Sequence, residues 1–221
     1  MVVDRRGLND LKMISNPKIK RWITGSHEAV SSNQKIGLLG GSFNPAHDGH
    51  LSISKIALQR LGLNQIWWVI SPRNPLKKYD FLYDFKDRVS SANKIINTNN
   101  IVISKLELNA QIKYTIGTLE YLRTRYPGVK FVWIMGADNL NQFHLWRECG
   151  KILSLMPIAI IDRPSSSLNV TSSIFANKYR AYRVDESDST NLIYHKNPAW
   201  VFMHTKLNYQ SSSKLRDSEV K

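Results

Sequence analysis

The sequence predicts a doubly wound α/β fold, in which a parallel sheet carries helices on both faces. Short apolar runs alternate with stretches of helical spacing along the chain. The runs are apolar throughout rather than at alternate positions, which is typical of strands buried on both faces of a sheet. With 42% hydrophobic and 22% charged residues, the 221-residue chain has a globular composition and can bury one substantial core.

The first predicted elements follow a basic N-terminal stretch. Residues 1–35 mix Arg, Lys, Asn, Ser and Gly without a sustained period, so we expect a mobile or peripheral extension. Residues 36–39 are predicted as a short buried strand that ends at a Gly-Gly pair. Residues 51–61 place apolar side chains at helical spacing, and Gly62 stands where a helix C-cap is expected.

The remaining elements alternate in the same way, within a single domain over residues 36–221. Further strands are short apolar runs, predicted at residues 66–70, 101–104, 130–135, 157–161 and 200–204. Helices are predicted at residues 84–96 and 115–125 and as a helical stretch over 139–155. Residues 164–198 are polar, and we expect an irregular excursion there. Right-handed crossovers then place the strand-to-helix loops along the carboxyl edge of the sheet, where open α/β sheets bind ligands.

The composition limits the classes of partner and of site. With 31 Lys and Arg against 17 Asp and Glu, the net charge of +14 favours an anionic partner, although a solvated basic surface explains it equally well. Cys149 is the single cysteine, which excludes an internal disulfide framework and a Cys-based zinc site. The apolar runs are too short to cross a bilayer. We see no secretory signal and expect a cytoplasmic protein.

The stretch GGSFNPAHDGH, from Gly40 to His50, is the strongest candidate for a site. Gly40 and Gly41 let the backbone turn sharply and approach a ligand. The helix that follows directs its free N–H groups and the positive end of its dipole at the same place. His47 and His50 can donate hydrogen bonds to phosphate oxygens there and stabilise developing charge. The spacing matches neither GxGxxG nor GxxxxGK[ST], so neither a dinucleotide fingerprint nor a Walker loop is indicated.

These eleven residues resemble the GG[ST]F[ND]PxHxGH signature of the HxGH nucleotidyltransferases. Other stretches are similar, in the same order, to the bacterial nicotinate-nucleotide adenylyltransferase family within that superfamily. They are residues 71–77, 114–119, 133–140 with Trp146, 162–164 and 211–216. The resemblance covers residues 35–217 and implies a Rossmann-like sheet with a C-terminal helical segment.

The resemblance implies an activity: transfer of AMP from ATP to nicotinate mononucleotide, giving deamido-NAD and pyrophosphate in NAD biosynthesis. The 5′-phosphate of the mononucleotide attacks the α-phosphorus in line, with no covalent enzyme intermediate. Such a protein has mainly to bring two polyanions together and to neutralise charge on the leaving pyrophosphate. Mg²⁺ carried by the ATP phosphates shares that role, so no metal site made of protein ligands is expected.

The resemblance also implies two sets of residues on the ATP side. The catalytic set is His47, His50, Lys77 and Arg216. The set that binds ATP is Gly40, Gly41, Ser42, Phe43, His47, His50, Gly136, Asp138, Ser211, Ser212, Ser213 and Arg216. The family commonly shows Pro-Pro-His-Lys where this chain has Asn74-Pro-Leu-Lys, so Lys78 competes with Lys77 for the phosphate contact. Ser213 replaces a Thr and keeps the hydroxyl.

The mononucleotide would be bound by Asn44, Tyr114, Thr115, Trp146 and Arg163. An indole face can stack on a pyridine ring, and hydroxyl and backbone N–H groups can receive its carboxylate. Arg163 suits the phosphate of the mononucleotide. The family often has Asp at the position of Gly117, and any role of that carboxylate is absent here.

Two other classes of function stay open on the sequence alone, and so does the oligomeric state. A phosphopantetheine adenylyltransferase or a cytidylyltransferase shares the HxGH turn but has no pocket like Thr115 with Trp146. A nucleic-acid-binding protein would account for the net charge. The chain has no helix-turn-helix signature, RNP-like motif or zinc spacing, so we expect neither nucleic acid nor membrane as a partner.

Overall fold

Parallel strands form one twisted sheet in the computed structural model, which describes residues 30–73, 75–76, 81–162 and 173–205. The strands are β1 (Lys35–Gly41), β2 (Gln65–Ile70), β3 (Ile101–Ser104), β4 (Lys130–Gly136), β5 (Ile158–Ile161), β6 (Arg183–Val184) and β7 (Trp200–Met203). Their order in the sheet is β3-β2-β1-β4-β5-β7-β6, and all neighbours are parallel. The predicted doubly wound parallel sheet is thereby confirmed.

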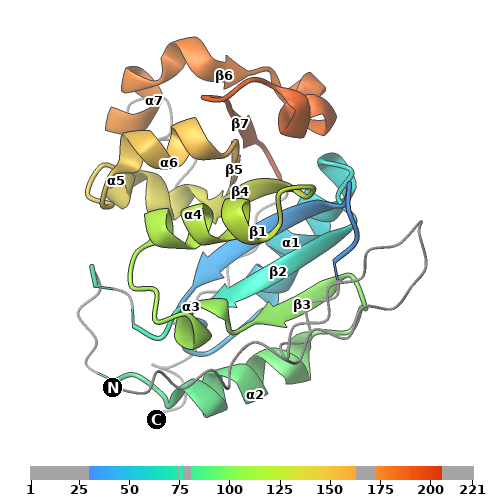
Figure 1. Cartoon of the computed structure of the whole chain (residues 1–221), viewed down its shortest axis with the longest axis vertical. Coiled ribbons are helices and arrows are strands. Elements are labelled where there is room, and N and C mark those ends of the chain that lie inside the picture. The colour runs from blue at the N-terminus through green and yellow to red at the C-terminus, as the bar shows by residue number, and fades with distance from the viewer. Residues whose placement is uncertain (1–29, 74, 77–80, 163–172, 206–221) are drawn as a thin grey trace, which may run out of the picture.

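Helices cover both faces of this sheet (Figure 1). They are α1 (Asp48–Arg60), α2 (Phe85–Ile95), α3 (Leu106–Asn109), α4 (Thr115–Arg125), α5 (Leu140–Phe143), α6 (Cys149–Leu155) and α7 (Ile174–Lys178). The described part of the chain also contains the 3₁₀ helices η1 (Ala137–Asn139), η3 (Arg180–Tyr182) and η4 (Glu186–Tyr194). No helix among the described residues is long and apolar enough to cross a membrane.

The strands are apolar along their whole length because each face of the sheet has its own core. On β2, Trp67 belongs to the core that contains residues of α4 and α6, whereas its neighbour Trp68 belongs to the core that contains residues of α1 and α2. Both indoles are fully buried. Burying one large apolar side chain is worth about 1.5–3 kcal/mol, so a strand with two buried faces is stabilised at every position.

Two parts of the chain depart from the predicted elements. Residues 164–198 were expected to be irregular, yet the part described contains α7, η3, β6 and η4, with Phe175 and Leu192 buried in the two cores. These elements are too short to show a period in the sequence. The single helical stretch predicted over 139–155 is divided into η1, α5 and α6, and Glu148, which precedes α6, adopts a left-handed conformation with φ of +55° that interrupts the helix there.

The described start of the chain is docked on the body. Val30 is 1% exposed and belongs to the core, and the backbone N–H of Asn33 donates to the carbonyl of Gly128 at 2.7 Å. Residues 30–35 therefore pack against the domain, although we expected them in a mobile or peripheral extension. Residues 1–29 lie outside the described part of the chain.

Strand order fixes where a ligand can enter. From β1 the chain winds outward to β2 and β3, and it then returns to the other side of β1 as β4 and continues to β5. Neighbouring loops leave the sheet in opposite directions at such a switch point and open a crevice beyond the carboxyl ends of the strands. The crevice here lies between the ends of β1 and β4.

Candidate active site

A cavity of about 520 Å³ occupies this switch point. It is lined by the ends of β1, β2 and β4, by the first turns of α1 and α4, and by residues 145–147. This volume lies in the range of small-molecule sites.

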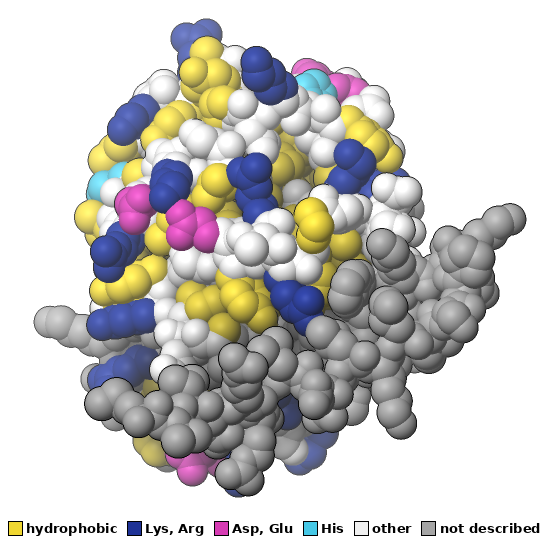
Figure 2. All heavy atoms as spheres, in the orientation of Figure 1, with side chains coloured by type: hydrophobic (Ala, Val, Ile, Leu, Met, Phe, Trp, Pro, Cys, Tyr) yellow, Lys and Arg dark blue, Asp and Glu magenta, His cyan; other side chains and the backbone are white. Residues whose placement is uncertain are grey.

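On the face shown in Figure 2, Lys and Arg side chains stand singly among neutral and acidic ones, as on a solvated surface.

The two histidines of the HxGH turn start α1 and fix each other's position. His47 is the N-cap of α1, and its Nδ1 accepts a hydrogen bond from the Gly49 N–H at 3.1 Å. The His47 N–H in turn donates to Nδ1 of His50 at 3.2 Å, which completes a capping box. Because both Nδ1 atoms accept, the neutral rings carry their protons on Nε2. Both imidazoles line the cavity, with ring centroids 3.9 Å apart.

The loop after β1 is held in an uncommon backbone conformation. Phe43 has φ of +46°, a region that non-glycine residues occupy at a cost of about 1–2 kcal/mol. Its ring stacks on Trp68 at 5.0 Å between centroids and lies 4.6 Å from the His50 ring. The aromatic side chain therefore anchors the loop, and Ser42 and Phe43 both line the cavity.

Gly40 lines the cavity together with Gly41, as expected of residues that let a ligand approach the backbone, and it also serves the packing of the sheet. A Cβ at this position would lie 2.4 Å from Cη2 of Trp133 on β4, closer than side chains can approach. Contact of Gly40 with ATP stays a prediction. Gly40 makes room for the Trp133 indole, which itself lines the cavity. Among the described residues, the buried Nε1 of Trp133 has no hydrogen-bond partner.

Asn44 lies beside the cavity and does not line it. Its side chain is 1% exposed; Nδ2 donates to the Phe81 carbonyl at 3.0 Å and Oδ1 accepts from the Tyr83 N–H at 2.9 Å. Asn44 was predicted among the mononucleotide-binding residues. In this structure its side chain ties the loop after β1 to residues 81–83, and a contact with the mononucleotide stays a prediction.

The other predicted pocket residues come together at one end of the cavity. Tyr114, Thr115 and Trp146 all line it, although 31 residues separate Thr115 from Trp146 in the sequence. Trp146 packs edge-on against Trp133, with ring centroids 6.1 Å apart. Thr115 is the first residue of α4, whose opening N–H groups have no acceptor within the helix and favour an anion.

Gly136 and Asp138, at the end of β4, complete the lining residues that the sequence predicted. The remaining predicted site residues, Lys77, its rival Lys78, Arg163, Ser211, Ser212, Ser213 and Arg216, lie outside the described residues.

Glu107 is a lining residue that the sequence interpretation missed. It belongs to α3, is 6% exposed, and accepts a hydrogen bond from Oγ1 of Thr118 on α4 at 2.7 Å. Burial raises the pKa of its carboxyl, against the hydrogen bonds from Thr118 and Ser71, which lower it. One signal was available: an acidic residue placed just after a buried strand belongs at the carboxyl edge of a parallel sheet.

Two cations at the mouth of the cavity were missed as well. Lys113 and Arg147 line the cavity and flank the Tyr114 ring, with Nζ and Cζ at 5.4 and 4.9 Å from its centroid. The described residues contain no group of three His, Cys, Asp or Glu able to hold a metal ion.

Known proteins are similar to this chain over most of its length. A family model described as cytidylyltransferase-like matches residues 38–218. The probable nicotinate-nucleotide adenylyltransferase of Agrobacterium fabrum is 43% identical over 183 residues, which cover 83% of this chain and 98% of that protein. The corresponding protein of Rhizobium meliloti is 44% identical over 184 residues, with the same two coverages.

The fold is also that of a solved enzyme. The Plasmodium falciparum nicotinic acid mononucleotide adenylyltransferase complexed with NaAD superposes with a TM-score of 0.62 at 24% identity, covering 84% of this chain and 83% of that one. The same enzyme complexed with APC gives a TM-score of 0.61 at 22% identity, with the same coverages. At these identities the likeness concerns the fold.

Proposed function

Because the chain belongs to the cytidylyltransferase-like family and, within it, to the nicotinate-nucleotide adenylyltransferases, we propose that it joins ATP and nicotinate mononucleotide into deamido-NAD, with release of pyrophosphate. It is a nucleotidyltransferase of NAD biosynthesis. The observation that carries the assignment is one cavity lined both by the HxGH pair and by Thr115 with Trp146. We expect it to act in the cytoplasm, where ATP is supplied.

In the reaction, an oxygen of the mononucleotide 5′-phosphate forms a bond to the α-phosphorus of ATP. The bond from the α-phosphorus to the bridging oxygen of the β-phosphate breaks, and its electron pair leaves with pyrophosphate. The Nε2–H groups of His47 and His50 donate to the phosphoryl oxygens as their charge develops. The Phe43 N–H adds a backbone donor. By family resemblance, Lys77, Arg216 and Ser211 to Ser213 supply further donors to the β- and γ-phosphates.

The mononucleotide binds at the other end of the cavity. The Trp146 indole stacks on the pyridine ring, and the opening turn of α4 with the Thr115 hydroxyl receives the pyridine carboxylate. Lys113 and Arg147 stand at the same mouth and favour the acid over the amide, since only the acid carries a negative charge on the ring substituent. Arg163 pairs with the phosphate by resemblance.

Mg²⁺ enters with ATP. The described lining offers the carboxyl groups of Glu107 and Asp138, and Glu107 is engaged by Thr118. This donor set fits an ion held by the ATP phosphates with at most one protein carboxylate, which is how Mg²⁺ is commonly bound. The ion neutralises charge on the phosphates when bound.

A pyrophosphate-release assay with ATP and Mg²⁺ tests the proposal. We expect release on addition of nicotinate mononucleotide, less with the amide, and none with ATP alone. Replacing the mononucleotide by 4′-phosphopantetheine, or ATP by CTP, is the matched control and should give no release. Turnover with either control substrate but not with the mononucleotides would replace the proposal by another activity of the superfamily.

A further inference from the structure

Arg88 is a buried cation that the mechanism above does not use. It lies on α2 and is 2% exposed, although the sequence of that helix looks like an ordinary surface helix. It does not line the cavity. Burying a guanidinium costs free energy unless its N–H groups donate to acceptors, so the acceptors of Arg88 indicate what the residue does.

The acceptors of Arg88 are carbonyls in loops that border the cavity. Nη1 donates to the carbonyls of Ser42 and Ser71, both at 2.7 Å, and Nη2 donates to the carbonyl of Pro72 at 2.9 Å. Nε donates to the carbonyl of Tyr83 at 3.1 Å. One planar group thus joins the loop after β1, the loop after β2 and the entry to α2.

The bond to Ser42 has a consequence for the cavity. The peptide bond between Ser42 and Phe43 is trans, so its C=O and N–H point in opposite directions. With the carbonyl held by Arg88 behind the loop, the Phe43 N–H is directed to the opposite side. Ser42 and Phe43 line the cavity and Arg88 does not, so that side is the cavity. Because the left-handed φ of Phe43 is unfavourable for a non-glycine residue, other contacts have to stabilise this orientation of the peptide.

We propose that Arg88 is a positioning residue of the phosphate cradle, which turns the Phe43 N–H toward the phosphates of ATP by fixing the Ser42 carbonyl. This inference rests on the proposed function. Lysine cannot replace arginine in this role. Its ammonium group is a point charge, whereas the planar guanidinium of arginine can donate to acceptors in several loops at once.

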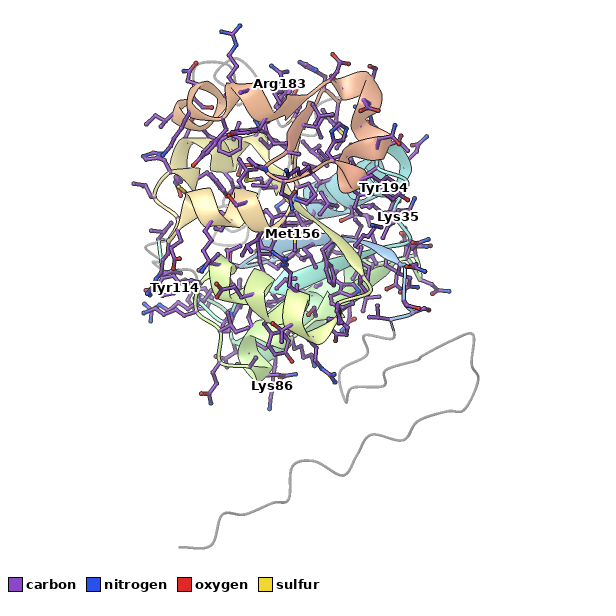
Figure 3. All side chains as sticks on the ribbon, turned by 45° about the horizontal axis from the view of Figure 1, so that its top comes forward. Lys35, Lys86, Tyr114, Met156, Arg183 and Tyr194 are labelled. Carbon is purple, nitrogen blue, oxygen red and sulfur yellow. The ribbon has the colours of Figure 1, made fainter. Side chains whose placement is uncertain are left out.

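The first test compares Arg88→Lys with Lys86→Ala, an exposed change on the same helix (Lys86 is labelled in Figure 3). In R88K we expect the KM for ATP and the Kd for pyrophosphate to rise about tenfold, the factor that corresponds to one misplaced hydrogen bond to a charged group. The KM for nicotinate mononucleotide should change less than about twofold. K86A should leave all three unchanged. A merely structural role would lower Tm and the active fraction but leave these constants as in the wild type.

The second test needs no variant to fold. In wild-type protein labelled with ¹⁵N-phenylalanine, the Phe43 amide resonance should shift when pyrophosphate is added. Calorimetry on the same sample establishes whether pyrophosphate binds. Binding without a Phe43 shift, or unchanged constants in R88K, would overturn the role of Arg88. No binding of pyrophosphate or ATP to the wild type would instead count against the proposed function itself.

Discussion

Replacing His50 separates its two tasks, capping α1 and donating to the transferred phosphoryl group. His50 occupies the third position of α1, where its Nδ1 accepts the His47 N–H at 3.2 Å. Glutamine is a common residue at this position of a capping box and can accept the same N–H through its side-chain oxygen. His50→Gln therefore keeps the cap and offers its side-chain N–H₂ group as a donor that no ring holds in place, whereas His50→Ala loses both the cap and the donor.

The magnitudes follow from these contacts. Loss of one preorganised donor to a developing oxyanion lowers kcat by about 10²–10³. Loss of a capping interaction costs about 0.5–2 kcal/mol of stability, which for a domain of this size lowers Tm by about 2–4 °C per kcal/mol. We expect H50A to lose kcat by this factor and to have a lower Tm, and H50Q to keep a Tm near that of the wild type with a kcat between those of H50A and the wild type.

Steady-state pyrophosphate release and thermal unfolding measure the two quantities on the same preparations. ATP binding, measured by calorimetry, should weaken far less than kcat falls in H50A, because the donor acts mainly on charge that develops during transfer. Equal losses in kcat and in ATP affinity would reduce His50 to a binding residue. A kcat for H50A within about fivefold of the wild type would refute the catalytic role.

Three further predictions concern the walls of the cavity. Burial raises the pKa of the Glu107 carboxyl, so the folded protein holds this proton more tightly than the unfolded chain does. The wild type should therefore lose stability as the pH rises from the ordinary value of 4.5 through the raised pKa, and Glu107→Gln should remove this loss. Plots of Tm against pH that run parallel for the two proteins from pH 4 to 8 would contradict this prediction. Replacing Lys113 and Arg147 together by Gln should lower the kcat/KM ratio of acid to amide mononucleotide by about three- to tenfold at low salt, and less at high salt; an unchanged ratio would show that neither cation selects the acid. Gly40→Ala should destabilise the protein by about 1–3 kcal/mol in denaturant unfolding, since its Cβ would meet Trp133 at 2.4 Å. Adding Trp133→Leu to this variant should recover part of the lost stability. If the effects of the two changes on the free energy of unfolding were fully additive, the contact would be contradicted.

The sheet was predictable because its strands are buried on both faces, which leaves short apolar runs such as Trp67 with Trp68 in the sequence. The boundaries of α4 match the predicted ones, since periodicity ends there at a Pro-Gly pair. The elements between residues 173 and 198 were not predictable. Each is shorter than the window of about 11–18 residues in which helical periodicity is recognised, and burial of Phe175 and Leu192 depends on the body of the domain.

The site was predictable as far as its chemistry is carried by a local motif. His47, His50 and the glycines stand within eleven residues, and the fold brings them to the same cavity as Thr115 and Trp146. Arg88 and Glu107 escaped because their importance comes from where the chain buries them, and a charged residue on a short helix gives no sign of burial in the sequence. Asn44 shows the converse: it stands inside the motif, yet its amide is bound to Phe81 and Tyr83.

The fate of the α-phosphorus tests the central claim most directly. Incubation with Mg²⁺, nicotinate mononucleotide and ATP labelled at the α-phosphorus should place the label in a dinucleotide with the mass of deamido-NAD, with one pyrophosphate released for each dinucleotide formed. Label that stays in ADP or AMP, or transfer of the γ-phosphoryl group to the mononucleotide, would contradict adenylyl transfer at this site.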